Sequence, residues 1–177
     1  MKKGIFLSLI LMFALTVNIG CEALDVTEEF TFEIEFVAQS DAAAFYAEEL
    51  LLADSLSSEI EEYSNLIKDI ELLEVTYQIT AVGETNEAGK INSGTLNVAD
   101  ESGNGEETIA NIENVDIIVM SSPASLPLNQ AGINRCGELI QNQPHHALII
   151  LAGTANGSPV DFTVKFFFKV KMTANPL

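Results

Sequence analysis

The sequence predicts a mainly β protein, an antiparallel β-sandwich with two helical insertions. Apolar and polar residues alternate with a period of two in several segments, most clearly in 160–172. Short connections rich in Gly, Asn and Asp separate these segments, as is usual between antiparallel strands. Two longer segments, 41–67 and 121–144, interrupt the alternation. An immunoglobulin-like topology is our first expectation, although the chain has no Trp, and an α+β fold with a helix packed on an antiparallel sheet is the alternative.

The first strand is predicted where every second residue is apolar, at Phe30, Phe32, Ile34 and Phe36. The period then changes. After an N-cap at Ser40 or Asp41, apolar residues follow helical spacing at Ala43, Tyr46, Ala47, Leu50 and Leu51. We therefore expect 41–67 to be a broken helical connection that covers an edge or an open end of the sheet.

Strand patterns return in the middle of the chain, over 70–81 and more weakly over 91–98, and a further strand is expected to end at 117–120. Residues 147–152 are apolar on both faces, which is typical of a central strand covered on each side. Asn156-Gly157 indicates a type I′ hairpin turn, because both of its central positions need positive φ.

The last predicted strand, 160–172, has the most regular alternation, with Phe167 as the one apolar residue on its polar face. Its period matches that of the first strand, so we expect both to contribute to one core. If the two strands are neighbours, Glu33 and Glu35 of the first lie on the same face as Lys165 and Lys169 of the last.

The N-terminus predicts export. Lys2 and Lys3 precede an apolar run over 5–17 that has the length of a signal-peptide core and is too short to span a bilayer comfortably. Gly20-Cys21 at its end resembles the lipobox of bacterial lipoproteins, although Val17 lies one position further from the cysteine than usual. The resemblance implies lipidation of Cys21, and ordinary secretion with a cut near it is the alternative.

This interpretation divides the chain into a signal peptide (1–20), a lipidated acidic tether (21–28) and a single β-sandwich domain (29–177). The resemblance implies a membrane-anchored protein of the bacterial cell envelope. Glu22 follows the cysteine in place of the Asp that retains lipoproteins at an inner membrane, so outer-membrane sorting is expected.

The charge of the chain excludes several partners. All 26 acidic residues follow residue 20, whereas Lys2 and Lys3 are two of the eight basic residues, so the net charge after residue 20 is −20. Such a surface repels phosphate backbones and anionic headgroups, and nucleic acid is therefore not an expected partner. Attachment to a membrane has to come from the N-terminal lipid instead of a basic patch.

Residues for catalysis are scarce. The sequence has no Gly-x-Ser-x-Gly, Ser-x-x-Lys, Cys-x-x-Cys or phosphate-binding loop. If Cys21 carries lipid, Cys136 has no cysteine partner, and we expect a buried, inert thiol there. His145 and His146 are adjacent at a strand entry, so their side chains are expected to point to opposite faces. We therefore expect a non-enzymatic binding, adhesion or assembly module without a cofactor, whose partner is an envelope protein or a glycan.

The best candidate for a metal site is the acidic loop 100–107. Oxygen ligands at Asp100, Ser102 and Asn104, followed by Gly105, resemble the first half of an EF-hand calcium loop. The twelfth position of that motif is a Glu, and here it is Asn111, so weak or no calcium binding is expected. An acidic hairpin loop without a ligand is the alternative, while a calcium-dependent or glycan-binding module is the second function that we consider.

The segment 121–144 is the candidate partner surface. Prolines interrupt its first part, 129–141 is weakly helical, and Pro144 ends the helical stretch. Glu138 is its only acid, so it is nearly neutral on an acidic chain. We expect a partner to contact Leu126, Leu128, Ile133 and Arg135. The alternative is that the segment caps one end of the sandwich and buries its leucines in the protein's own core.

Overall fold

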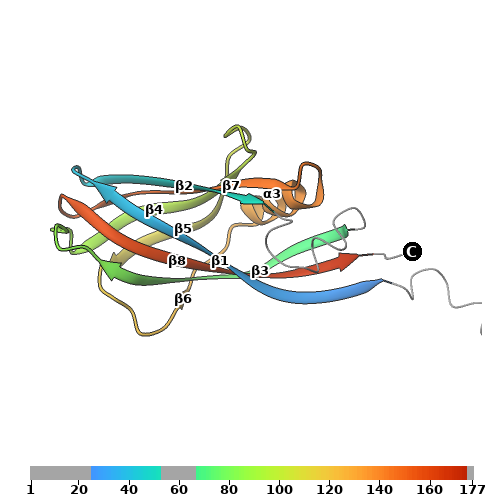
Figure 1. The fold of residues 1–177 in the computed structure, drawn as a ribbon, viewed down its shortest axis with the longest axis horizontal. Helices are drawn as coiled ribbons and strands as arrows, with labels where there is room; N and C mark the ends of the chain where they lie inside the picture. The colour runs from blue at the N-terminus through green and yellow to red at the C-terminus, as the bar shows by residue number, and fades with distance from the viewer. Residues whose placement is uncertain (1–24, 53–66, 175–177) are drawn as a thin grey trace, which may run out of the picture.

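A computed structural model describes residues 25–52 and 67–174, and in these ranges it contains two four-stranded antiparallel sheets packed face to face (Figure 1). The first sheet has the order β1-β8-β3-β6 and the second has the order β2-β7-β4-β5. The elements are β1 (Val26–Ser40), β2 (Ala44–Leu52), β3 (Ile67–Val82), β4 (Lys90–Ala99), β5 (Glu107–Asp116), β6 (Ala124–Ser125), α3 (Gln130–Gln141), β7 (His146–Ala155) and β8 (Val160–Ala174).

The sandwich class is confirmed, and the strand order is that of a jelly roll. The chain passes from one sheet to the other at nearly every connection, and β4 and β5 are the only consecutive strands that pair within a sheet of the described part. An immunoglobulin domain instead pairs A with B and D with E in one sheet, so the immunoglobulin-like expectation was wrong. The α+β alternative was also wrong, because two sheets enclose the core.

The first and last strands contribute to one core, as predicted, and the structure also makes them neighbours. β1 pairs antiparallel with β8 along its whole length, with Phe32 opposite Phe168 and Glu35 opposite Lys165. The phenyl rings of Phe32 and Phe168 stack with centroids 5.0 Å apart. On the outer face the Lys165 ammonium lies 2.8 Å from Glu33, whereas Lys169 binds Glu29 at 2.7 Å instead of either predicted glutamate.

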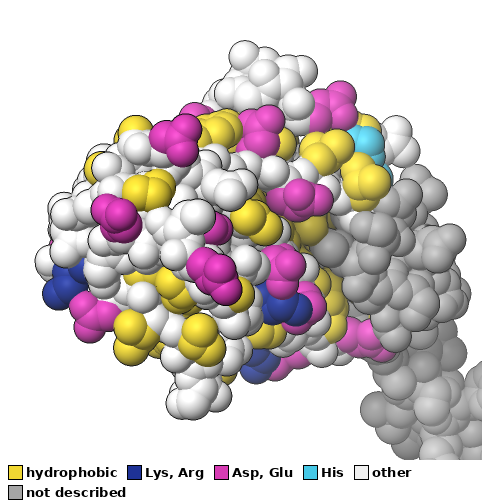
Figure 2. All heavy atoms as spheres, turned by 60° about the vertical axis from the view of Figure 1, so that its left-hand side comes forward, with side chains coloured by type: hydrophobic (Ala, Val, Ile, Leu, Met, Phe, Trp, Pro, Cys, Tyr) yellow, Lys and Arg dark blue, Asp and Glu magenta, His cyan; other side chains and the backbone are white. Residues whose placement is uncertain are grey.

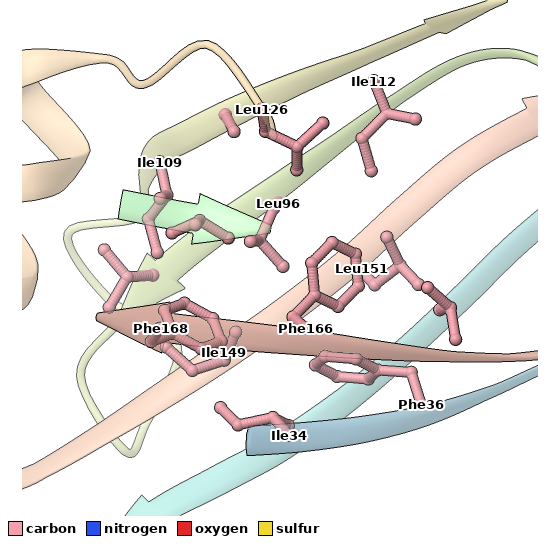
Figure 3. Packing of buried hydrophobic residues seen from close by; sticks show 14 of the residues in the cluster. Ile34, Phe36, Leu96, Ile109, Ile112, Leu126, Ile149, Leu151, Phe166 and Phe168 are labelled. Atoms are coloured by element: carbon pink, nitrogen blue, oxygen red, sulfur yellow. The ribbon is translucent and has the colours of Figure 1, made fainter. Parts of the chain in front are cut away.

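The core lies between the sheets. Figure 3 shows Ile34 and Phe36 of β1 beside Phe166 and Phe168 of β8, with Leu96, Ile149 and Leu151 reaching them from the second sheet. Every second residue of β8 is buried from Val160 to Ala174, so the predicted alternation is confirmed. Because β8 lies between β1 and β3, its backbone already has a strand on both sides.

The helical prediction for 41–67 was wrong over the part that the structure describes. Residues 44–52 form β2, an edge strand in which Phe45 and Leu51 are buried. The apolar residues counted for the helix lie on both faces of this strand, and the phenyl ring of Phe45 packs edge-on against Phe162 of the other sheet. Pairing with β7 therefore decides the conformation. Residues 53–66 lie outside the described ranges.

Other element boundaries also differ from those predicted from the sequence. Residues 26–28, expected in the tether, are the first residues of β1. β5 ends at Asp116, so the strand predicted to end at 117–120 stops earlier, and the segment after it crosses to the first sheet, where the Met120 N–H donates to Ile79 O. In β3, register shifts at Leu72/Glu74 and Ile79/Ala81 change which residues face inward, so Leu73 is not among the buried ones.

Asn156-Gly157 is not a hairpin turn. The strands on either side, β7 and β8, belong to different sheets, and neither residue has positive φ. The Asn156 side chain instead accepts hydrogen bonds from the backbone N–H groups of Gly89 and Lys90. The motif therefore joins two loops at one end of the sandwich.

The helix predicted at 129–141 is confirmed as α3, capped by the Asn129 side chain, which accepts a hydrogen bond from Ala131 N. It lies at the end of the sandwich where β1 begins (Figure 1) and contacts β3 and β5. Gly132 and Gly137 face those strands. A Cβ at Gly132 would lie 2.2 Å from Thr108 O, and one at Gly137 would lie 2.7 Å from Ile70 O. Only glycine permits so close an approach.

Candidate functional site

A cleft of about 350 Å³ lies between loop 100–106, the second half of α3 and residues 142–146. It brings together residues that are far apart in the sequence and that the sequence assigned to different sites, namely Asp100 and Ser102 from the loop, Arg135 and Glu138 from α3, and His146 from β7. With Glu101 of the same loop, three carboxylates, a guanidinium and an imidazole line one hollow.

Asp100 organises the loop. Its Oδ1 accepts hydrogen bonds from the backbone N–H groups of Ser102 and Asn104, both at 2.9 Å, and these bonds hold the pKa of its carboxyl below the usual range. Gly103 and Gly105 complete the turn with φ of 81° and 61°. One oxygen of the carboxylate proposed as a calcium ligand is thus already occupied by the loop's own backbone.

Arg135 and its neighbours fasten this loop to the rest of the domain. The Arg135 Nε donates to Gly105 O at 3.2 Å, and its guanidinium lies 3.6 Å from the Glu138 carboxylate one turn along α3. On the other side of the loop, Asn97 Nδ2 donates to Glu106 Oε1 at 2.5 Å. Arg135 therefore positions the loop, a role that the sequence did not predict.

The two histidines have different surroundings. His146 lies in β7 with its Nδ1 3.0 Å from the Glu101 carboxylate, at the rim of the cleft. His145 precedes the strand with a positive φ of 64°, and its Nδ1 donates to Ile140 O at 2.8 Å. The pairing of His146 with Glu101 had no sequence signal, because only the fold brings loop 100–106 beside the start of β7.

The apolar residues proposed for partner contact face the protein's own core. Leu126 is buried and its N–H donates to Val75 O, while Leu128 and Ile133 are partly buried and pack against the core cluster. The prediction that Leu126 anchors a partner was therefore wrong. Its side chain fills the space between the sheets, which is the capping role considered as the alternative.

Cys136 is buried, as predicted. It lies on the inner face of α3, and burial raises the pKa of its thiol to about 12. A protonated thiol without access to solvent is a poor nucleophile and a poor metal ligand.

The chemistry that the cleft supports is polar recognition. Its charged groups are mostly engaged with one another, as in Arg135–Glu138 and His146–Glu101. Within the described ranges, no cluster of three His, Cys, Asp or Glu side chains is arranged to hold a metal ion. None of the helices in the same ranges combines the length and the apolar character needed to cross a bilayer.

No family model and no curated protein matches the chain. Among solved structures, a chain from Desmodium yellow mottle tymovirus is similar, with 10% identity over 86% of this chain and 90% of that one and a TM-score of 0.31. A chain from turnip yellow mosaic virus has 13% identity over 87% and 82%, with a TM-score of 0.33. The decameric BFDV capsid protein has 9% identity over 84% and 98%, with a TM-score of 0.38.

Proposed function

We propose that the protein is a non-enzymatic lipoprotein of the bacterial cell envelope, held at the outer membrane by lipid on Cys21, whose sandwich is a binding, adhesion or assembly module. The N-terminal pattern of Lys2, Lys3, an apolar run and Gly20-Cys21 supports the anchor. Only four residues lie between Cys21 and Val26, where β1 begins, and the five Cα–Cα steps between the two span at most about 18 Å. A lipid on Cys21 would therefore keep the start of β1 close to the membrane.

This anchor would orient the domain. β1 has 15 residues, so the loops at its far end lie about 50 Å from its start. Four connections meet at that end, which is on the left in Figure 1 and is turned toward the viewer in Figure 2, at 41–43, 83–89, 117–123 and 156–159. Backbone bonds join three of them, including Glu87 N to Pro159 O at 2.9 Å and Ile117 N to Gly89 O at 3.0 Å.

The observation that carries the binding role is an exposed apolar pair at this far end. Ile118 and Val119 are 60% and 62% exposed, on a connection that hydrogen bonds attach to both sheets. Exposure of two adjacent β-branched side chains to water is unfavourable in free energy, and burial against a partner would relieve this penalty. Calcium-dependent or glycan binding through the acidic loops stays the second prediction.

Lipidation is tested by mass spectrometry of the protein extracted from membranes. We expect cleavage after Gly20 and an added lipid mass on Cys21, and we expect Cys21→Ser to appear in the soluble fraction. A mature chain with an unmodified Cys21 thiol would contradict the anchor.

The binding surface is tested separately by photo-crosslinking at position 118 in intact cells. We expect one crosslinked species that Val119→Asp abolishes and that Tyr46→Asp leaves, because Tyr46 is a similarly exposed residue on β2. Equal crosslinking in both variants would show that the far end is not the binding surface.

A further inference from the structure

We propose that the open side of the sandwich, between the edges of β1 and β2, binds an extended strand in which basic and apolar residues alternate. This site is distinct from the far-end loops, and the observations for it do not depend on lipidation of Cys21.

Both strands have one edge along which no other described strand pairs. β1 pairs with β8 and β2 pairs with β7, and each is the outermost strand of its sheet among the residues that the structure describes. On such an edge, every second residue directs its backbone N–H and C=O away from the sheet, where an added strand can bond to them. β1 is 15 residues long, so its edge offers many backbone groups to an added strand.

A groove runs between the two edges. It has a volume of about 380 Å³ and is lined by residues 33–35 of β1 and 49–52 of β2. Leu50 is 42% exposed on its rim, while Ile34 and Leu51 belong to the buried core. An apolar side chain inserted between the edges would therefore extend the core of the sandwich.

Glu49 shows that this side is open to water. It occupies an inward-facing position of β2, two residues before Leu51 and four after Phe45, both of which are buried. Glu49 itself is exposed. An inward-pointing charge on an edge strand stays solvated only where the opposite sheet does not cover it.

The charge of the groove selects a basic partner. Glu33 and Glu35 share a single cation, with Lys165 Nζ 2.8 Å from the first carboxylate and 3.8 Å from the second. No Lys or Arg of the described residues lies within salt-bridge distance of Glu49. Glu33 and Glu35 therefore share one ammonium on the outer face, and Glu49 adds a carboxylate to the groove lining without a cation beside it; Lys or Arg side chains of an added strand would compensate the excess negative charge.

The same charges disfavour a second copy of this chain as the occupant. In antiparallel pairing of β1 with itself, every register centred on residues 31 to 34 places one glutamate opposite another, drawn from Glu29, Glu33 and Glu35. Like charges directly opposite each other destabilise a sheet. A different chain with Lys or Arg at alternate positions meets no such repulsion.

The test is isothermal titration of the full-length protein in detergent with the acetylated, amidated peptide Thr-Lys-Val-Lys-Val-Lys-Val-Thr. We expect saturable binding, a tenfold or greater loss of affinity for the triple variant Glu33→Gln, Glu35→Gln, Glu49→Gln, and a change below twofold for the control Glu84→Gln, Glu107→Gln, Glu113→Gln. The control removes the same charge from exposed sites away from the groove. Circular dichroism verifies that both variants are folded.

Two peptide controls separate strand addition from charge attraction. N-methylation of alternate peptide amides should abolish binding, and a peptide of the same composition with its lysines adjacent should bind at least tenfold more weakly. The proposal is overturned if the peptide does not bind the protein, if both triple variants bind it equally, or if the peptides with alternating and adjacent lysines bind equally. Sedimentation showing a dimer that Glu33→Lys dissociates would assign the groove to a second copy and overturn it as well.

Discussion

Replacing Gly132 with alanine tests how closely α3 approaches the second sheet. In an exposed helix this substitution stabilises, because alanine favours the helix over glycine by about 1 kcal/mol. Here the added Cβ would lie 2.2 Å from Thr108 O and 2.5 Å from Ile109 N. Both are backbone atoms of β5, so no side-chain rotation relieves the contact.

The expected loss follows from the geometry. An ordinary contact needs at least about 3.4 Å, so α3 and β5 would have to separate by more than 1 Å, which disturbs the packing of Ile140 and Cys136 on the same helix. Overpacking of this kind costs about 1–3 kcal/mol, and the upper part of that range applies because backbone meets backbone. After the helix preference is subtracted, we expect a net loss of about 1–2 kcal/mol and a Tm lower by about 2–8 °C.

Thermal and urea unfolding of the purified protein measure this loss. Gly137→Ala is the graded comparison, because its Cβ would meet a single backbone atom, Ile70 O, at 2.7 Å, and the loss should be smaller. Asn134→Ala, at an exposed position of α3, should change stability by no more than about 0.5 kcal/mol. A Gly132→Ala protein as stable as the original would refute the close approach of α3 to β5.

Two further outcomes follow from the core. Phe168→Ala should lower the free energy of unfolding by about 3–5 kcal/mol in urea titrations, because the ring is fully buried and stacks on Phe32, and a loss below 1 kcal/mol would contradict this packing. Cys136 should not react with a thiol reagent at pH 8 until urea unfolds the protein. Since burial raises the pKa of its thiol to about 12, the unfolded chain releases this proton first, and stability should fall by about 1.4 kcal/mol per pH unit above about pH 9. Cys136→Ala should lack this contribution, and an unchanged pH dependence in the variant would contradict it.

The local sequence pattern was sufficient to predict a strand where one hydrophobic period dominates the segment. β8 and β1 could be predicted from sequence because their apolar residues fall on one face over many residues, and only a strand buried on one side satisfies that pattern. The matching periods also predicted that the two strands share one core. α3 was predicted in spite of its glycines, and the apolar surroundings of Cys136 in the sequence correctly indicated a buried thiol.

The candidate cleft could not be predicted from sequence. Asp100 and Arg135 were each selected for a separate role, but the bond from Arg135 to Gly105 O and the contact of His146 with Glu101 join positions at least 30 residues apart. No local signal encodes such a distance. A contact between distant residues also explains why the helical pattern of 129–141 is weak in the sequence. Gly132 disfavours a helix, but its close contact with β5 leaves no room for a Cβ atom.

The sequence by itself therefore determined the class of the fold and its most regular strands, because these depend on hydrophobic period and composition. The tertiary structure decided the rest. The apolar residues of 44–52 follow a helical spacing, but hydrogen bonding to β7 makes the segment a strand. The jelly-roll order depends on which edges pair, and pairing between β1 and β8, more than a hundred residues apart, is set by the burial of both sheets against each other.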